Sequence, residues 1–445
     1  MAVPETEPKT RGNTLRWAGL AAVVGLALVV GVLIGNGGGE DEPRKAAAGP
    51  VPAGKATSQS AQRPVPAGAL YVDKDSKKGK CDDARPVAEA KSQSTPWCSA
   101  VKAVQLAPAG ATVVLQEGKY PEIRATRNPE REKTVTVRGA PGGRVLVTKI
   151  LAKRANNLRF EGLRVTRGVG LFDTENIAIV NSEIVPAGMY IGHSKDTLVE
   201  GNDIRDGGSG DRALIAQGKS SGPSDPGNEN LTIRDNHFSN LSYDAIAVYT
   251  GVKNLVIEGN EIDNVIPQGK AGLHVDAIQV TGGDGIDIRD NFLHDSTHGL
   301  LVKDAVAKKL KVHNNTFARI GAAAVVISNA PGARLTSNTV WDSDSGVLLG
   351  DLEQIPEKTS AVLEDNVFDV FRDQGDLIKS ARRNIIAGGG ELDSRGGLIG
   401  GRPKFVNPKK LDYRLAPGSA GEGEGAGGKN IGSSGRMPAG ASAPN

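Results

Sequence analysis

The chain is poor in aromatic residues, in cysteine and in net charge, and each shortage narrows the range of functions. Aromatic side chains make up 4% of the 445 residues, which is sparse for a protein that stacks many sugar rings. The 54 basic and 51 acidic residues leave a formal charge of only +3. Because no basic stripe with interleaved aromatic residues accompanies this balance, we expect no nucleic acid partner.

Helical periodicity is also missing over most of the chain. A crossover helix needs roughly ten or more residues with a 3.6-residue period. Between residues 155 and 370 the sequence contains no such interval. This absence disfavours a doubly wound α/β fold.

A short phrase with a central asparagine recurs in the same region. It consists of an apolar residue, a polar pair, an asparagine and, soon after, another apolar residue. Its asparagines are Asn202, Asn236, Asn260, Asn291, Asn315, Asn338 and Asn366. The steps between them are 34, 24, 31, 24, 23 and 28 residues, so the longer steps are the basic unit with an insertion. A repeat of this length made of β-type pieces is typical of a solenoid.

Each unit holds two or three short runs rich in Val and Ile with alternating polarity, separated by Gly, Asn and Asp. Coils of three such strands must stack so that their inward apolar residues are buried. Asparagine suits a turn because it tolerates the left-handed backbone conformation. Since stacked strands lie about 4.8 Å apart, the repeated asparagines are also expected to form an amide ladder with a structural role.

Both ends of this region carry boundary signals. Thr95-Pro96 predicts the start of a helix that includes Trp97, Val101 and Val104 and ends at 108–110. Such a helix would cap the first coil and protect its open edge. The last structured stretch is expected at 405–419. Residues 421–445, rich in Gly, Ala and Ser, are expected to form a disordered tail.

An uncharged stretch near the start predicts a membrane anchor. Residues 17–35 form nineteen uncharged residues behind a basic segment at 1–16. A run near twenty spans a bilayer and keeps its basic flank in the cytoplasm. A flexible Pro/Ala/Gly linker at 36–68 follows, so the domain at 69–420 is expected outside the plasma membrane. The alternative is a cleaved signal, which would give a protein secreted without residues 1–48.

The two cysteines, Cys81 and Cys98, lie close together near the expected capping helix. An exported domain favours a disulfide between them. Two thiols alone make a poor metal site.

The whole of residues 69–420 resembles the right-handed parallel β-helix proteins of the pectate-lyase-like group. The resemblance rests on the opening segment at 70–73, the capping helix, the segment at 118–122, the asparagine coils and the Pro-Gly-Ser close at 417–419. It implies an all-β fold, a right-handed parallel β-helix with an N-terminal capping helix, preceded here by the transmembrane helix. The fold alone does not set the activity, because it serves lyases, hydrolases, epimerases and non-catalytic surface proteins.

Aligning the strand after each first turn brings one polar column together. It contains Arg212, Asp244, Asp276 and His298, on successive coils. The residues expected close to this column are Tyr243, Tyr249, His274, Gln279, Arg289, His294 and Lys303. Two neighbouring carboxylates repel each other, which raises the pKa of one so that it stays protonated as a general acid. Glycoside hydrolysis uses such a pair.

The order of these residues is similar to that of polygalacturonase-type hydrolases. The resemblance implies that Asp244 and Asp276 are the catalytic carboxylates and that His298 is their supporting base. The sequence departs from the pattern, since Ser242-Tyr243 replaces an asparagine, a single Asp276 replaces a paired Asp-Asp, and the Arg-x-Lys coil is absent. By strict alternation Asp276 also points inward with Ile278, so it must lie at a bend or be paired inside.

Two alternatives stay open. A lyase would use Lys303 or Arg289 as the base, and Asp244 with Asp276 would be an alternative site for Ca²⁺, although no metal or other cofactor is predicted outright. A non-catalytic envelope module would bind glycan or protein along the solenoid. His193, His237 and His313 are interpreted as ordinary turn residues. The leading hypothesis is a cell-surface protein that cleaves an acidic polysaccharide.

Overall fold

The computed structural model describes residues 64–127, 130–207, 212–217, 227–268, 275–350, 358–388 and 397–435. All of them belong to one compact unit, Pro52–Asn445. In this part of the chain no helix combines the length and apolar character needed to cross a bilayer. The expected anchor at 17–35 and the linker up to residue 63 lie outside the described residues, so they stay predictions.

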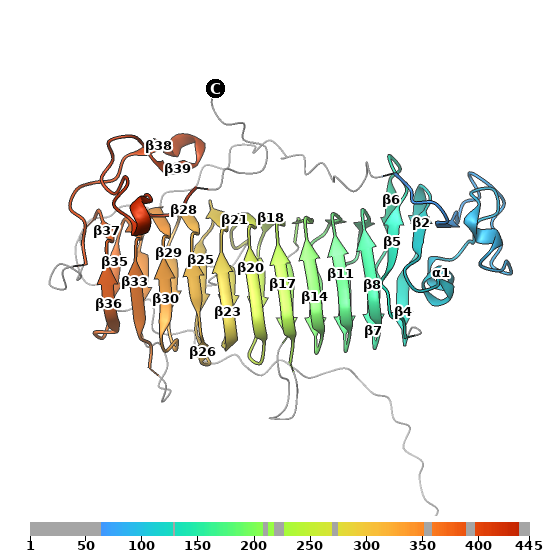
Figure 1. Cartoon of the computed structure of the whole chain (residues 1–445), viewed down its shortest axis with the longest axis horizontal. Coiled ribbons are helices and arrows are strands. Elements are labelled where there is room, and N and C mark those ends of the chain that lie inside the picture. The colour runs from blue at the N-terminus through green and yellow to red at the C-terminus, as the bar shows by residue number, and fades with distance from the viewer. Residues whose placement is uncertain are drawn as a thin grey trace, which may run out of the picture. The chain divides into compact units, whose positions relative to one another are not determined.

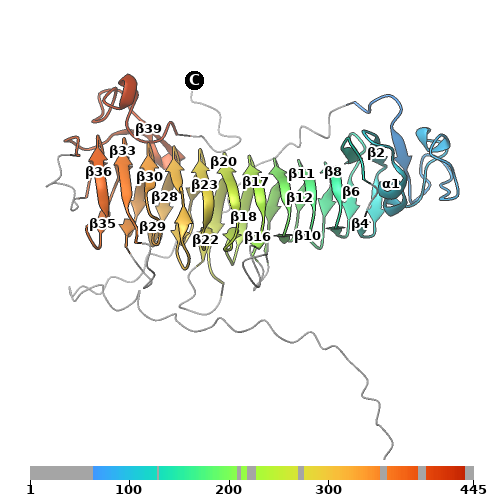
Figure 2. The same cartoon turned by 60° about the horizontal axis from the view of Figure 1, so that its bottom comes forward.

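The described residues form three long parallel sheets, and each coil contributes one strand to each sheet in turn (Figures 1 and 2). Sheet A contains β1 (Leu70–Val72), β2 (Thr112–Leu115), β5 (Val135–Gly139), β8 (Asn156–Glu161), β11 (Glu175–Val180), β14 (Lys195–Glu200), β17 (Glu229–Arg234), β20 (Lys253–Glu258), β23 (Gly283–Arg289), β26 (Ala307–Lys308), β27 (Lys311–His313), β30 (Ala333–Thr336), β33 (Ala361–Glu364) and β36 (Ile378–Arg382). Sheet B contains β3 (Gly118–Tyr120), β6 (Val145–Val147), β9 (Arg164–Val165), β12 (Glu183–Ile184), β15 (Asp203–Arg205), β18 (His237–Leu241), β21 (Glu261–Val265), β24 (Phe292–His294), β28 (Thr316–Ile320), β31 (Thr339–Ser343), β34 (Val367–Phe368) and β37 (Ile385–Ile386). Sheet C contains β4 (Ile123–Thr126), β7 (Ile150–Lys153), β10 (Val169–Phe172), β13 (Met189–Gly192), β16 (Leu214–Gln217), β19 (Ile246–Val248), β22 (Asp276–Val280), β25 (His298–Val302), β29 (Ala323–Ile327), β32 (Gly346–Leu349) and β35 (Phe371–Asp373).

The core is built from inward side chains that stack on their equivalents in the next coil. In sheet A one such column is Phe160, Ile179, Val199, Ile233, Ile257 and Ile288, and each member is fully buried. Burying one such side chain contributes about 1.5–3 kcal/mol before entropy is counted. Because every coil adds the same layer, the repeat confirms the predicted parallel β-helix.

The repeated asparagines form a continuous buried ladder, as predicted. Asn260 donates its main-chain N–H and its Nδ2 to Oδ1 of Asn291, both at 3.0 Å. Asn291 repeats both bonds to Asn315 at 3.0 Å and donates Nδ2 to the carbonyl of Ile257 at 2.8 Å. The same pattern runs from Asn202 to Asn384. Each amide therefore ties its own coil to both neighbours.

The left-handed position of this turn is not the asparagine itself. It is the residue just before, such as Asp235 (φ 55°), Asp290 (φ 57°) or Gly259 (φ 64°). The expectation that asparagine serves here for its left-handed backbone was wrong, because its side chain is needed inside the coil.

The N-terminal cap differs from the prediction in its start. α1 spans Ala100–Leu106, and its N-cap is Ser99, whose hydroxyl accepts the N–H of Lys102. Trp97 lies before the helix, where it pairs with Val72 as an isolated bridge and is fully buried. A 3₁₀ turn, η2 (Glu89–Lys91), precedes it. The expected disulfide is present between Cys81 and Cys98.

The segment after residue 397 packs on the late coils, contrary to the expected loose tail from 421. It holds β38 (Phe405–Asn407), η4 (Pro408–Lys410), β39 (Asp412–Leu415) and η5 (Ala426–Gly428). Ile431 is buried against Val367 and Ile385, and the N–H of Ser433 donates to Oγ1 of Thr339 at 2.9 Å. These contacts cover the outer face of sheet B at its late strands β31, β34 and β37. Residues 436–445 lie outside the described part.

Replacing Asn291 by alanine tests the ladder. Asn291→Ala removes the acceptor of two buried donors and the donor to the carbonyl of Ile257. We expect the free energy of unfolding to fall by about 3 kcal/mol, because buried groups without partners cost about 1–3 kcal/mol each. Urea unfolding followed by circular dichroism measures this change.

Asn254→Gly is the matched control. Asn254 is an exposed asparagine with φ 53° whose amide donates to Asn230 at 3.0 Å. Glycine keeps the left-handed backbone available, so the loss should stay below about 1 kcal/mol. Equal losses in the two variants would contradict the structural importance of the buried ladder.

Candidate active site

The predicted polar column lies along one edge of sheet C. Asp276 is in register with His298, and Ile246 of the preceding coil is in register with Ile278. Asp244, two residues before Ile246, therefore faces Asp276, and Arg212 occupies the preceding coil. Four side chains spread over 87 residues of sequence are brought into one row.

Direct contacts link the members of this row. Arg212 Nε donates to Asp244 Oδ2 at 2.7 Å. Asp244 Oδ1 accepts the main-chain N–H of Asp276 at 3.0 Å. Asp276 Oδ2 accepts from Gln279 Nε2 at 3.2 Å, and its Oδ1 lies 3.9 Å from Nδ1 of His298. The arrangement runs cation, carboxylate, carboxylate, imidazole.

Asp276 is a buried carboxylate that has a hydrogen-bond partner. Its carboxylate contacts Gln279, whose side chain lies on the opposite face of β22 from Ile278. Of the two alternatives that the sequence left open, a bend or a buried and paired carboxylate, the contacts of Asp276 fit the second. Asp276 is 0% exposed, and Asp244 is 3% exposed.

Burial changes the acid–base character of Asp244. Burial and the nearby charge of Asp276 raise the pKa of Asp244. The hydrogen bonds from Asp276 N and Arg212 act in the opposite direction and do not cancel the rise. Asp244 is thus the carboxyl of this pair that is biased toward its protonated form, as the sequence predicted for one of the two.

Aromatic rings continue this face on neighbouring coils. The guanidinium carbon of Arg212 lies 5.8 Å from the ring centre of Tyr249. On the earlier coils Phe172 and Tyr190 stack with ring centres 5.1 Å apart. All three rings are partly exposed. The sequence singled out Tyr249 but missed Phe172 and Tyr190, which stand at outward positions of β10 and β13 in the same sheet.

The other predicted neighbours are distributed less tightly. Tyr243 is partly exposed beside Asp244. Lys303 follows the last residue of β25, five residues from His298, so it lies in the same sheet but outside the row, 3.8 Å from Asp304. His274 lies outside the described residues.

Two residues expected near the row belong to other faces. Arg289 ends β23 in sheet A, where Glu258 at 2.5 Å and Asp287 at 2.7 Å hold it. His294 ends β24 in sheet B. The placement of both was wrong, because Arg289 precedes the turn at Asn291 and His294 follows it, so the two lie in sheets A and B and not in sheet C. Arg289 is therefore no base for the row.

A second polar cluster lies on the outer face of sheet B and was missed. His237 Nε2 lies 2.7 Å from Asp263 Oδ1, and His294 Nε2 lies 3.4 Å from Glu261 Oε1. His237 begins β18, so its interpretation as a turn residue was wrong. The missed signal is the position just after each ladder asparagine, where Asp203, His237 and Glu261 follow one another on successive coils.

The carboxylates around His237 control its protonation. Burial alone lowers the pKa of His237, but the carboxylates of Asp203 and Asp263, with a contribution from Glu261, outweigh it and raise the pKa to about 10. The pKa of His294 is also raised, since its hydrogen bonds to Asp295 and Glu261 outweigh its burial. The raised pKa of His237 keeps this imidazole in its positively charged form at neutral pH.

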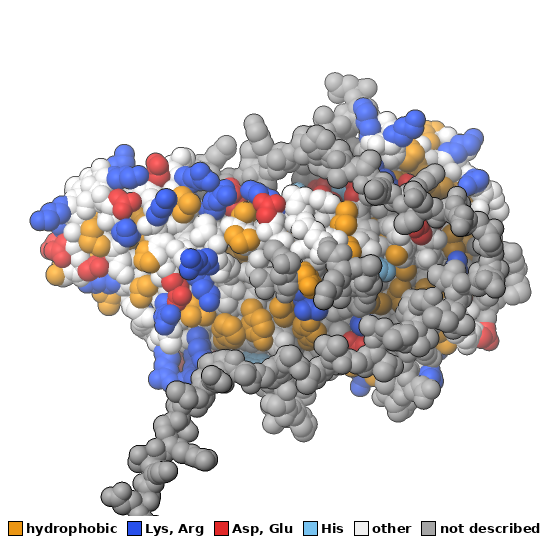
Figure 3. All heavy atoms as spheres, turned by 180° about the vertical axis from the view of Figure 1, so that it is seen from behind, with side chains coloured by type: hydrophobic (Ala, Val, Ile, Leu, Met, Phe, Trp, Pro, Cys, Tyr) orange, Lys and Arg blue, Asp and Glu red, His pale blue; other side chains and the backbone are white. Residues whose placement is uncertain are grey.

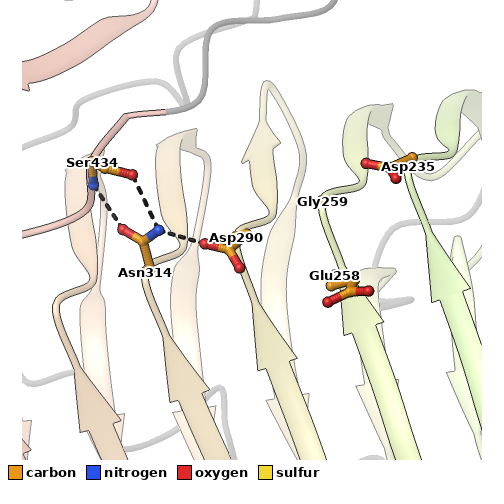
Figure 4. Close-up of a pocket in the computed structure, with 6 residues that line it drawn as sticks. All are labelled: Asp235, Glu258, Gly259, Asp290, Asn314 and Ser434. Carbon is orange, nitrogen blue, oxygen red and sulfur yellow. Dashed lines mark hydrogen bonds between the residues drawn. The ribbon is translucent and has the colours of Figure 1, made fainter.

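A pocket of about 380 Å³ lies over the asparagine turns (Figure 4). Asn314 exchanges hydrogen bonds with Ser434 of the C-terminal segment at one end, at 2.7 and 3.1 Å. Asp235 and Glu258 line the other end (Figure 4). The charge of Glu258 is compensated by Arg289. Figure 3 shows basic, acidic and hydrophobic side chains interspersed on the described surface opposite to the view of Figure 1, in keeping with the balanced composition.

The stacked sheets and the asparagine ladder define a parallel β-helix protein. The family described as "Right handed beta helix region" matches residues 148–277 and 270–387, which together exceed half of the chain. The chain therefore belongs to the right-handed β-helix family. No curated protein matches it.

Solved structures with a similar fold include several that act on polysaccharides. Pectate lyase Pel9A is 13% identical over 85% of this chain and 99% of its own, with a TM-score of 0.46. XylC in complex with xylose is 12% identical over 69% of this chain and 76% of its own, with a TM-score of 0.42. A rhamnogalacturonan lyase is 14% identical over 79% of this chain and 94% of its own, with a TM-score of 0.38. These values describe a distant likeness of fold, and no activity follows from them.

Replacing Asp244 by alanine tests how tightly the row is coupled. Asp244→Ala removes the acceptor of the buried N–H of Asp276 and leaves Arg212 without its carboxylate. We expect the free energy of unfolding to fall by about 2–3 kcal/mol. Chemical unfolding of purified protein measures the change.

Glu183→Ala is the control for an ordinary surface pair. Glu183 also faces an arginine, Arg164, at 2.8 Å, but its side chain is 47% exposed. Its loss should cost less than about 1 kcal/mol. An Asp244→Ala protein as stable as the Glu183→Ala protein would mean that the row is not a coupled unit.

Proposed function

We propose that this protein is a carbohydrate-active β-helix protein that cleaves an acidic polysaccharide at the Arg212, Asp244, Asp276 and His298 row. The observation that supports this most is the pair of neighbouring carboxylates on adjacent coils, one of which has a raised pKa. Glycoside hydrolysis needs a protonated carboxyl beside an ionised one. We therefore favour hydrolysis over elimination.

In this mechanism Asp244 is the general acid. Its raised pKa lets it hold a proton that it gives to the leaving glycosidic oxygen. Asp276 is the second carboxylate of the pair, which attacks the sugar or activates water. Coils are about 4.8 Å apart, nearer to the roughly 5–5.5 Å separation typical of retaining enzymes than to the wider inverting one. His298, 3.9 Å from Asp276, supports that carboxylate.

The surroundings of the row suit an acidic sugar chain. Arg212 and, farther along the sheet, Lys303 are partly exposed cations that attract a uronate carboxylate. Tyr249, Tyr190 and Phe172 offer partly exposed rings on which the apolar face of a sugar can pack. These three rings provide a stacking surface for sugars, although aromatic residues are sparse in the chain as a whole.

A second function, glycan binding without cleavage, is favoured by one observation. Both carboxylates of the row are buried, at 0% and 3% exposure, and a substrate must contact a catalytic carboxyl directly. In that case the exposed members, Arg212 and His298, would bind the glycan, and the buried pair would only position them.

Reducing-end release from polygalacturonate, alginate and other uronate polymers separates these functions. We expect cleavage by the wild type without the ultraviolet absorbance of an unsaturated uronate, and turnover at least about 10²-fold lower in Asp244→Asn and Asp276→Asn. On the alkaline side of the pH profile, activity should fall as the pH rises through the raised pKa of Asp244, because the acid then loses its proton. Arg212→Gln removes a group that favours the ionised form, so this fall should move to higher pH.

Asp173→Asn is the matched control, since Asp173 follows β10 in the same sheet and its side chain is 47% exposed. It should keep wild-type turnover. Binding of a uronate polymer without product would support the non-catalytic function. Activity in Asp276→Asn equal to the wild type would remove the proposed mechanism, and product with ultraviolet absorbance would replace hydrolysis by elimination.

We also propose that residues 17–35 anchor the β-helix outside the plasma membrane. The uncharged stretch behind a basic segment supports this. The full chain should sediment with membranes and resist extraction at alkaline pH, whereas a chain that begins at residue 36 should not. N-terminal sequencing of the mature protein checks the alternative: a start near residue 49 in the medium would show a cleaved signal.

A further inference from the structure

We propose that the outer face of sheet B binds a divalent transition-metal ion through His237, Glu261 and Asp263, with His294 as a fourth ligand. This site is separate from the proposed cleavage row, because its residues belong to β18, β21 and β24 of sheet B and not to sheet C. Neither site needs the other, so each can fail alone.

The ligand atoms already converge. Within the described part of the chain, His237, Glu261 and Asp263 form the one set of three metal-binding side chains whose ligand atoms all lie within 4.8 Å of one another. Asp263 Oδ1 lies 2.7 Å from His237 Nε2. From the following coil, His294 Nε2 comes within 3.4 Å of Glu261 Oε1. Two imidazoles thus approach the carboxylates of β21 from both sides.

The Nδ1 atom of each ring faces a carboxylate, as is common for metal-binding histidines. His237 Nδ1 faces Asp203 Oδ1 at 3.7 Å, and His294 Nδ1 lies 2.7 Å from Asp295 Oδ2. A histidine that binds a metal through Nε2 commonly directs its Nδ1–H to a carboxylate, which fixes the ring and increases its basicity. Each Nε2 is therefore left directed at the β21 carboxylates.

The supporting carboxylates are themselves fixed. Arg205 Nε holds Asp203 at 2.9 Å, and Arg319 pairs with Asp295. Asp203 Oδ1 is buried and receives no hydrogen bond from a described residue. Buried acceptors of this kind normally have a donor. A proton kept on Nδ1 of a metal-bound His237 would face this oxygen.

The ligand types select the class of ion. Imidazole nitrogen together with carboxylate oxygen suits Zn²⁺ and its neighbours in the transition series. Ca²⁺ and Mg²⁺ prefer shells made of oxygen alone. The side chains of Asp263 and His294 are only 10% and 7% exposed, so little water competes for the ion there.

Calorimetric titration of the untagged full chain with Zn²⁺ at pH 8, after treatment with a chelator, tests the site. We expect one Zn²⁺ per chain, a higher thermal midpoint with Zn²⁺ than without, and no comparable binding of Ca²⁺. His237→Gln and Asp263→Asn should each weaken Zn²⁺ binding at least tenfold. His313→Gln is the matched control, because His313 also contacts a carboxylate, Asp287 at 2.8 Å, but belongs to no set of three among the described residues.

A second measurement decides the matter if a variant fails to fold. In wild-type protein labelled with ¹⁵N-histidine, Zn²⁺ should shift the ring-nitrogen resonances of His237 and His294 in the NMR spectrum, and not those of His313. The proposal is overturned if the wild type shows no saturable Zn²⁺ binding, if His237→Gln binds as tightly as the wild type, or if Ca²⁺ binds and Zn²⁺ does not. If polysaccharide cleavage is absent but Zn²⁺ still binds, only the proposed function of the row in sheet C is contradicted.

Discussion

The register between successive coils is the constraint on which the remaining structure depends. The buried asparagine ladder sets it, because each amide accepts two hydrogen bonds from one neighbouring coil and donates to the next. A slip of one residue would break these bonds. It would also turn every inward side chain of a strand outward. The ladder and the apolar columns therefore specify the same alignment, and insertions between strands leave it unchanged.

This register creates functional geometry from residues that are distant in sequence. Arg212, Asp244, Asp276 and His298 form one row because their strands follow the same turn of four successive coils. The cluster around His237 and Glu261 arises in the same way one sheet away. On a solenoid a polar column needs compensation for its charges, since like charges would otherwise repel at the short spacing between coils. In sheet B imidazoles alternate with carboxylates along the column, whereas in sheet C the adjacent Asp244 and Asp276 lie between Arg212 and His298.

The sequence predicted the fold well because the repeat specifies the stacked coils. It predicted local details less well where the role of a residue depends on contacts with other coils. Asparagine was assigned to the left-handed turn position, but its buried amide bonds require the neighbouring residue, such as Asp290, to take that conformation. His237 was overlooked because its partners are 26 and 34 residues away and lie beside it only after stacking. The segment at 421–435 has the composition of a loose tail. A few side chains, Ile431 among them, nevertheless suffice to dock it.

Both polar columns need cations that compensate the charge of their carboxylates, but the cations differ in type. The type of cation affects which chemistry each column can support. In sheet C the cation is Arg212, whose guanidinium keeps its proton at any ordinary pH. Arg212 can therefore orient Asp244 and attract an anionic sugar, but it cannot lose its proton and bind a metal ion. In sheet B the cations are imidazoles, which bind a metal once they release the proton that their carboxylates stabilise. In the roles proposed for these columns, the kind of cation is thus what distinguishes the acid–base chemistry of one face from the metal binding of the other.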